Sequence, residues 1–172
     1  MHSLHFILIQ SDRDLEAGEV FVLAADAIEP FRDDVFDWHA EGPGRWGQEY
    51  PAPLSFRKEP ERFRSELASI ISGIECSRHD ALDYLVRQLG LRADSPSESV
   101  GRALFGNAGS LPEHTLWAAI RFLKLMRGDY VPDSGFYDAV EGSARMPNPE
   151  QILQRVLGET EDIYLVPMDL HC

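Results

Sequence analysis

The chain has 172 residues, of which 44% are hydrophobic and 10% aromatic, so it is long and apolar enough to fold around its own core. Sixteen Lys and Arg residues stand against 29 Asp and Glu residues, which gives a formal net charge of −13. This balance argues against binding to nucleic acid or to an anionic membrane surface, because both need a basic face. We therefore expect neither kind of partner.

The compartment follows from the cysteines and from the apolar runs. Cys76 and Cys172 are too few for a disulfide framework in a chain of this length. The first residues lack the basic region and long apolar core of a signal peptide, and no apolar run approaches the roughly 18 residues that span a bilayer. These features predict a cytoplasmic protein.

The first elements are a strand and a helix. Residues 4–9 are an apolar run rich in β-forming side chains, which predicts a buried strand. Ser11 and Asp12 can cap a helix that continues to about Phe31 and carries one apolar stripe. Residues 20–23 are compatible with a short strand instead, although the helix is the favoured interpretation.

The middle of the chain changes character and then becomes helical. Residues 35–50 contain Gly42-Pro43-Gly44 between aromatic residues, a pattern that predicts two short strands joined by a tight turn. Capping residues, prolines and glycines then predict four helices. Two are expected over about 60–74 and 77–89, and the other two begin at about residue 95 and about residue 110. The last of these helices is apolar around nearly its whole circumference, which predicts a place in the core.

The final segment predicts a strand at 136–140, a helix over 148–158 and a closing strand at 163–171. Pro167 lies inside the closing strand and indicates an edge position or a bulge. The order of elements predicts an α+β fold: a small, mostly antiparallel sheet built from both termini and packed against about five or six helices. We expect residues 1–172 to form one domain, with a helical lobe at about 57–128 inserted between the sheet segments.

The negative charge is concentrated early in the chain. Residues 12–41 contain ten Asp or Glu residues against only Arg13 and Arg32. One interpretation is a solvated helix face that keeps the protein soluble. The other is a docking surface for a basic partner.

The most distinctive stretch is 37–47, DWHAEGPGRWG. A rigid glycine turn with Trp38 and Trp46 on either side can project Arg45 as a clamp for an anion or a carboxylate, with His39 and Glu41 as further binding residues. The alternative is a structural hairpin in which both tryptophans fill the core and Arg45 pairs with a structural acid.

Asp37-Trp38 followed by Gly44-Arg45-Trp46-Gly47 resembles the "DW…GGRW" signature of a group of uncharacterised bacterial and phage proteins. In that group a strand and an Ala-rich helix precede the signature, and a strand ending in Asp-x-His closes the chain. This sequence has the same layout at both ends, including Asp169-Leu170-His171, but has Gly-Pro-Gly where the group has Gly-Gly. The group has no assigned activity, so the resemblance implies a layout and no function.

A second constellation lies in the terminal strands. Asp169 and His171 are two residues apart on a strand and therefore point to the same face. If the two terminal strands are neighbours, His5 can join them, and two imidazoles with one carboxylate suit zinc or iron(II). The alternative is that these residues are ordinary solvent-facing or hydrogen-bonded strand residues.

No complete catalytic motif accompanies these candidates, so we assign no catalytic residue and no cofactor. The leading hypothesis is a cytoplasmic, non-enzymatic interaction or regulatory module whose acidic segment and Trp/Arg turn bind a protein partner of basic character. The alternative is a small metal-dependent enzyme or anion-binding domain in which Arg45 holds an anionic group beside His39, Asp169 and His171.

Overall fold

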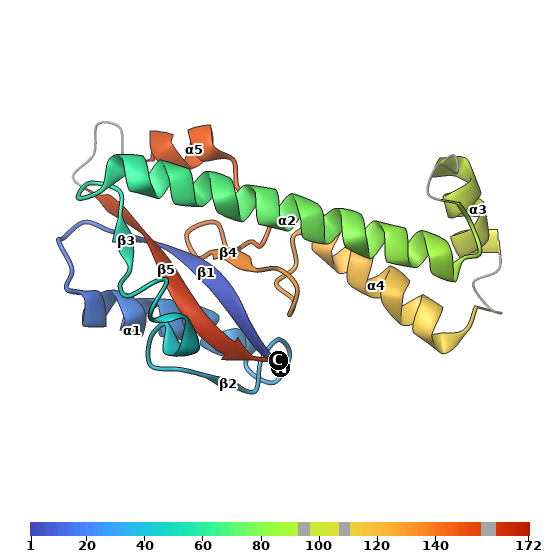
Figure 1. Ribbon diagram of the computed structural model, residues 1–172, viewed down its shortest axis with the longest axis horizontal. Coiled ribbons are helices and arrows are strands. Elements are labelled where there is room, and N and C mark those ends of the chain that lie inside the picture. Colours follow the sequence, from blue (N-terminus) through green and yellow to red (C-terminus); the bar gives the residue numbers. More distant parts are fainter. Residues whose placement is uncertain (93–96, 107–110, 156–160) are drawn as a thin grey trace.

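The computed structural model describes residues 1–92, 97–106, 111–155 and 161–172. In these ranges the chain forms a sheet body from which a long helical arm projects (Figure 1). The strands are β1 (His2–Ser11), β2 (Trp38–His39), β3 (Leu54–Ser55), β4 (Phe136–Asp138) and β5 (Asp162–His171). The helices are α1 (Ala17–Ile28), α2 (Pro60–Gln88), α3 (Ser97–Gly106), α4 (Glu113–Arg127) and α5 (Pro149–Gln154), with short 3-10 helices at Glu29–Phe31 and Gly44–Trp46.

The centre of the sheet is the pair β1 and β5. These strands run antiparallel over their whole length, from His2 opposite His171 to Ser11 opposite Asp162. The strand order is β2-β5-β1-β4, with β3 also paired to β5. The two ends of the chain thus build the sheet, and the fold is α+β as expected. The expectation of a mostly antiparallel sheet is wrong, because β4 pairs parallel to β1 and the sheet is mixed. The long crossover through the arm allows β4 to return in this direction.

Pro167 lies in the interior of β5 without breaking the sheet. It is opposite Phe6, whose backbone N–H donates to Gly135 O on the other side of β1. The nitrogen of Pro167 therefore faces away from β1, toward the other side of β5. On that side β3 pairs with residues 164 and 165 and β2 with residues 170 and 171, so Pro167 lies between their pairings. The expected edge position holds only locally, because β5 itself is flanked on both sides.

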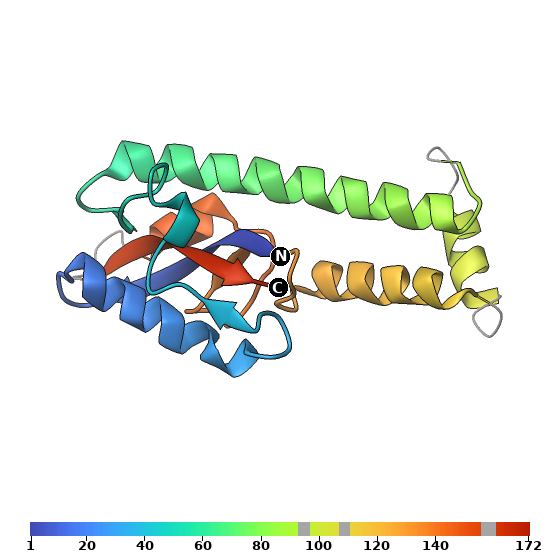
Figure 2. The same cartoon turned by 60° about the horizontal axis from the view of Figure 1, so that its bottom comes forward.

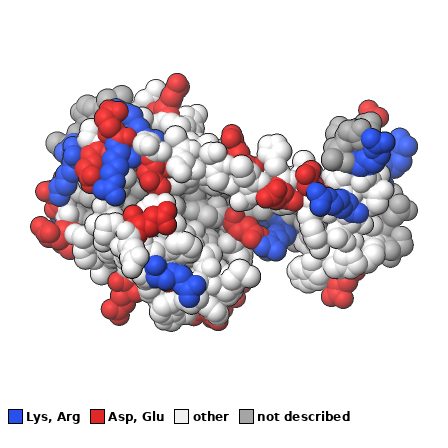
Figure 3. All heavy atoms as spheres, in the orientation of Figure 1, with Lys and Arg blue, Asp and Glu red and all other residues white. Residues whose placement is uncertain are grey.

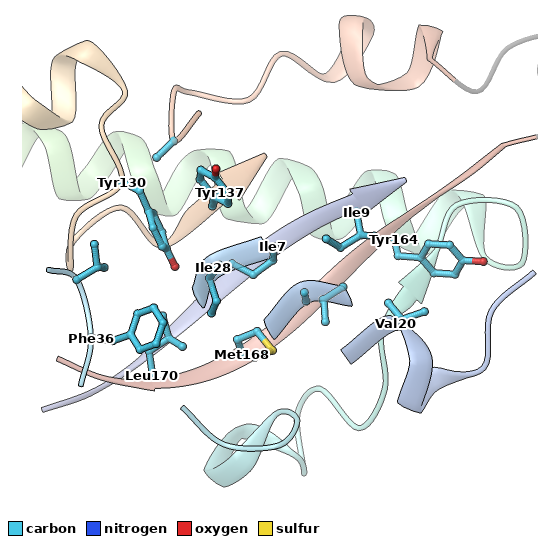
Figure 4. Close-up of a cluster of buried hydrophobic side chains, with 14 of the residues drawn as sticks. Ile7, Ile9, Val20, Ile28, Phe36, Tyr130, Tyr137, Tyr164, Met168 and Leu170 are labelled. Atoms are coloured by element: carbon cyan, nitrogen blue, oxygen red, sulfur yellow. The ribbon is translucent and has the colours of Figure 1, made fainter. Parts of the chain in front are cut away.

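Each face of the sheet carries its own core. Ile7 and Ile9 point to the face covered by α1, where they pack with Val20, Ile28 and Met168 (Figure 4). Phe6 and Leu8 point to the other face, where α2 and α5 supply most of the packing partners. The alternation along β1 and β5 therefore decides on which side of the molecule each of their polar residues lies.

The helix α1 begins at Ala17, after a capping box formed by Glu16 and Glu19. It includes residues 20–23, so the strand alternative for that segment is wrong. Val20, Ala24 and Ile28 are its buried residues and recur every fourth position, which fixes the face that packs on the sheet. The expected end of the last helix at Gly158 lies outside the described residues.

The arm consists of α2 and α4 side by side, with α3 at its far end (Figure 2). The prediction of two helices separated between residues 74 and 77 is wrong, because α2 is a single helix of 29 residues that continues unbroken through Ser77. Ser77 and the nearby Gly73 are weak helix formers, so helix propensity does not explain this continuity. Packing explains it, because α2 packs on the sheet and, farther along the arm, against α4. Among the described residues, no helix combines the length and the apolar character needed to cross a bilayer.

The expected core position of the helix over 110–127 is also wrong. Thr115, Ala119 and Leu125 are the residues that α4 buries. Several of its large apolar residues face solvent instead, with exposed fractions of 43% for Leu116, 63% for Trp117, 50% for Leu123 and 55% for Met126. One side of α4 packs in the arm and the other has no partner within the described chain.

Candidate functional site

The glycine turn lies against the end of β5. Gly44–Trp46 is a 3-10 helix and not the second strand of a hairpin, with Trp46 N donating to Pro43 O at 2.9 Å. Gly44 has φ 52° and lies so close to Asp169 that a Cβ atom added at Gly44 would be 2.6 Å from Asp169 Cβ. Glycine is required here both by the backbone conformation and by the close approach.

Asp169 is the buried acceptor that fixes this turn. Its side chain is 3% exposed, and its two oxygens accept different hydrogen bonds. Arg45 N donates to Oδ2 at 3.1 Å, and His2 Nδ1 lies 2.9 Å from Oδ1. A buried carboxylate satisfied at both oxygens is a strong organising element for the backbone around it.

A second imidazole–carboxylate pair lies beside the first. His171 Nδ1 is 2.7 Å from Asp37 Oδ1, and this hydrogen bond lowers the pKa of Asp37. The His2 ring meets His171 edge-on at 5.3 Å between centroids and Trp38 at 5.9 Å. We call these five residues the His–Asp cluster: His2, Asp37, Trp38, Asp169 and His171.

The sheet separates the other expected members from this cluster. His5 points to the face of α1, where its Nδ1 lies 2.9 Å from Tyr130 Oη and its Nε2 lies 3.1 Å from Pro132 O. It is fully buried, and desolvation lowers its pKa from 6.5 to about 4. His39 is opposite Leu170 in the register, on the same face as His5, and its ring meets Phe36. Neither histidine reaches Asp169 or His171.

The remaining residues of the turn are at the surface. Arg45 joins the cluster only through its backbone, since its side chain is exposed and forms no ion pair with the described residues. Glu41 is exposed as well, and Trp46 is half-buried with no hydrogen-bond partner for its Nε1. Among the described residues, no cation–π contact joins the Arg45 guanidinium to Trp38 or Trp46, so the structure gives the expected clamp no supporting contact.

The expected metal ligands do not converge. His5 is on one face of the sheet, whereas Asp169 and His171 are on the other. In the described part of the chain, no three His, Cys, Asp or Glu side chains are grouped so that they could hold a metal ion. The cluster that does form includes His2, which the sequence patterns did not single out, and Asp37, which they gave as part of the 37–47 stretch but not as a site residue. Alternation places His2 and His5 on opposite faces of β1, but only the pairing of Leu4 with Asp169 shows that His2 is the histidine on the face of Asp169.

The acidic side chains of residues 12–41 lie at the surface on and around α1. Every acid in residues 12–41 is exposed, and in the described chain only four of them form ion pairs, with Arg13, Arg32, Lys58 and His171. Figure 3 shows acidic side chains along the lower left of the body, where α1 lies. We call this surface the acidic face: Asp12, Asp14, Glu16, Glu19, Asp26, Glu29, Asp33, Asp34, Asp37 and Glu41.

Two apolar side chains stand within the acidic face. Val22 is 60% exposed and Leu23 is 38% exposed. Together with Glu19 and Asp26 they follow the spacing i, i+3, i+4, i+7, so all four lie on the side of α1 that points away from the sheet. This side of the helix combines an apolar centre with acidic flanks.

An open groove of about 1180 Å³ lies between the base of α4, the segment after β4 and α5. The ion pair between Arg155 and Asp138 lines it, with Arg155 Nη2 2.8 Å from Asp138 Oδ2 and 3.2 Å from Glu141 Oε1. One guanidinium stands against two carboxylates here, so these three side chains keep a net charge of −1, and the exposed Glu141 carries it toward solvent.

Comparison with known proteins gives no further assignment, since no family model, no curated protein and no solved structure matches the chain. The resemblance to the "DW…GGRW" group therefore stays a prediction.

Proposed function

We propose that this protein is a non-enzymatic, cytoplasmic interaction or regulatory module that binds a basic partner protein through its acidic face. The observation that carries the proposal is the outer side of α1, where exposed Val22 and Leu23 lie between Glu19 and Asp26. Protein interfaces commonly have an apolar centre that supplies affinity and a polar rim that supplies specificity.

The charge of this surface supports a basic partner. Asp26, Asp33, Asp34 and Glu41 are exposed and form no ion pair with the described residues, so their charges act outward. Unpaired charges of one sign raise the rate at which an oppositely charged partner associates, and salt screens that effect. A basic protein is thus favoured over an acidic or a neutral one.

The metal-dependent alternative has less support. It needs Arg45, His39, Asp169 and His171 around one point, and the sheet directs His39 to one face and the two strand residues to the other. The His–Asp cluster instead ties the two ends of the chain, which meet at one end of the sheet, to the glycine turn, a structural role for which its hydrogen bonds suffice.

Charge reversal on the acidic face tests the proposal. Asp26→Lys with Asp34→Lys changes two exposed acids that form no ion pair with any residue the structure describes, so the fold should be unaffected. Glu75→Lys with Asp80→Lys makes the same change of net charge on exposed positions of α2 and serves as the matched control.

The tagged proteins are used to capture partners from cells, and the captured proteins are quantified by mass spectrometry. We expect a basic protein that wild type and control retain and that the acidic-face variant loses, with direct binding confirmed on the purified pair. Equal capture of every bound protein by both variants would contradict the proposal.

A further inference from the structure

The side of α4 that faces solvent carries a pattern that the acidic face does not explain. Glu113, Leu116, Ile120, Leu123 and Arg127 follow one another at steps of three, four, three and four residues. This is the a/d spacing of a coiled-coil seam over two heptads. We call these five residues the α4 seam.

The α4 seam is distinct from the side of the helix that packs in the arm. Thr115, Ala119 and Leu125 are buried, whereas Leu116 and Leu123 are 43% and 50% exposed and Trp117 beside them is 63% exposed. Figure 2 shows α4 along one edge of the arm, with no other element beyond it in that view. Exposed leucines flanked by an exposed tryptophan form an apolar patch, and such patches commonly mark the contact surface for another protein.

The charges at the two ends of the seam favour a second copy of this chain as its binding partner. Glu113 is at the start of α4 and accepts a hydrogen bond from Trp117 Nε1 at 3.4 Å. Arg127 is at the end of α4, with its Nε 3.8 Å from Asp129 Oδ1, and both Glu113 and Arg127 are exposed and lie on the seam. If two copies of α4 pack antiparallel about a two-fold axis at Ile120, Glu113 of each copy lies level with Arg127 of the other, and Leu116 lies within one residue of the level of Leu123. A parallel pair would instead set Glu113 against Glu113 and Arg127 against Arg127, which like charges disfavour. The seam is therefore complementary to itself in one orientation only.

We propose that the protein forms a homodimer in which the α4 seams of two copies pack antiparallel, so that the two arms join through their α4 helices. Such an interface is isologous and closed, because the same residues serve both copies. The α4 helix spans about 22 Å, so the contact is short and the dimer should dissociate on dilution. The proposal is independent of the acidic face, which lies on the other part of the molecule.

Sedimentation equilibrium over about a hundredfold range of protein concentration measures the association directly. We expect wild type to pass from monomer to dimer across that range and Leu123→Glu to stay monomeric. Val22→Glu, the same kind of change at a comparably exposed position on α1, is the control and should dimerise as wild type does. Circular dichroism of each variant verifies that the helices are retained.

A charge exchange tests the antiparallel orientation. Glu113→Arg alone and Arg127→Glu alone each create two like-charge contacts per dimer and should weaken association at least tenfold. The double variant restores both contacts and should recover most of the wild-type affinity, although each substitution is unfavourable for the isolated helix because it opposes the helix dipole. A wild type that is monomeric at every concentration would overturn the proposal, and so would a double variant no better than the single ones.

Discussion

Gly44 lies directly against Asp169, with the position of its absent Cβ atom 2.6 Å from Asp169 Cβ, and this close approach joins the glycine turn to the end of the sheet. The backbone of Gly44 has φ 52°, a conformation that residues with a side chain adopt at a cost. The turn, the buried carboxylate and both terminal strands therefore form one structural unit.

Replacing Gly44 tests this unit. Gly44→Ala should lower the free energy of unfolding by about 1–3 kcal/mol, because it adds backbone strain and a clash with Asp169. Gly18→Ala is the matched control, since Gly18 lies in α1 with nothing within 4 Å of an added Cβ, and it should leave stability unchanged or raise it slightly. Urea denaturation of the two variants measures the difference, and equal stabilities would contradict the assigned contact.

The two imidazole–carboxylate pairs should differ in their contribution to stability. Asp169→Ala leaves Arg45 N–H and His2 without their buried acceptor and should cost about 1–3 kcal/mol. Asp37→Ala removes a pair whose carboxylate is 68% exposed, so its effect on the urea midpoint should fall within experimental error. An equal loss in both variants would show that burial does not distinguish the pairs.

Acidification should destabilise the protein through His5. Burial lowers the pKa of His5 to about 4 in the folded state, from 6.5 when it is exposed. Between these values the unfolded chain binds the extra proton and the folded chain does not, so stability falls as the pH falls from about 6.5 toward 4, by up to about 1.4 kcal/mol per pH unit.

The variant His5→Gln should remove this contribution. Its unfolding free energy should depend less steeply on pH over that window than that of wild type, whereas His114→Gln, at an exposed histidine of α4, should keep the wild-type slope. Urea denaturation at several pH values measures the slopes. An unchanged slope in His5→Gln would mean that His5 titrates normally.

The sequence predicted the elements that carry a strong local signal. The apolar runs at both termini and the strand near Phe136 correspond to observed elements. The helix predicted after Ser11 is observed too, but its predicted cap is wrong, because Ser11 ends β1 and α1 begins at Ala17 with Glu16 as its cap. Local signals could not give the parallel direction of β4 or the continuity of α2 through Ser77, because both depend on where the chain packs after a long excursion.

The candidate site was harder to predict because it depends on register. A shift of one residue in the pairing of β1 with β5 would bring a different β1 residue opposite Asp169, with its side chain on the other face of β1. The sequence alone does not determine this pairing. The exposure of Leu116 and Leu123 could not be foreseen either, since an all-round apolar helix suits a core and a bundle between two chains equally. The acidic face needed no such information, because a segment so rich in acids remains in water in almost any fold.

The most direct test of the central claim is the association rate constant between the protein and the basic partner that it captures, measured at low and at physiological ionic strength. Our account predicts that this rate falls at least tenfold with added salt for wild type and for Glu75→Lys/Asp80→Lys. For Asp26→Lys/Asp34→Lys it should already be low without salt. An association rate that is the same in all three proteins and indifferent to salt would contradict a function carried by the acidic face.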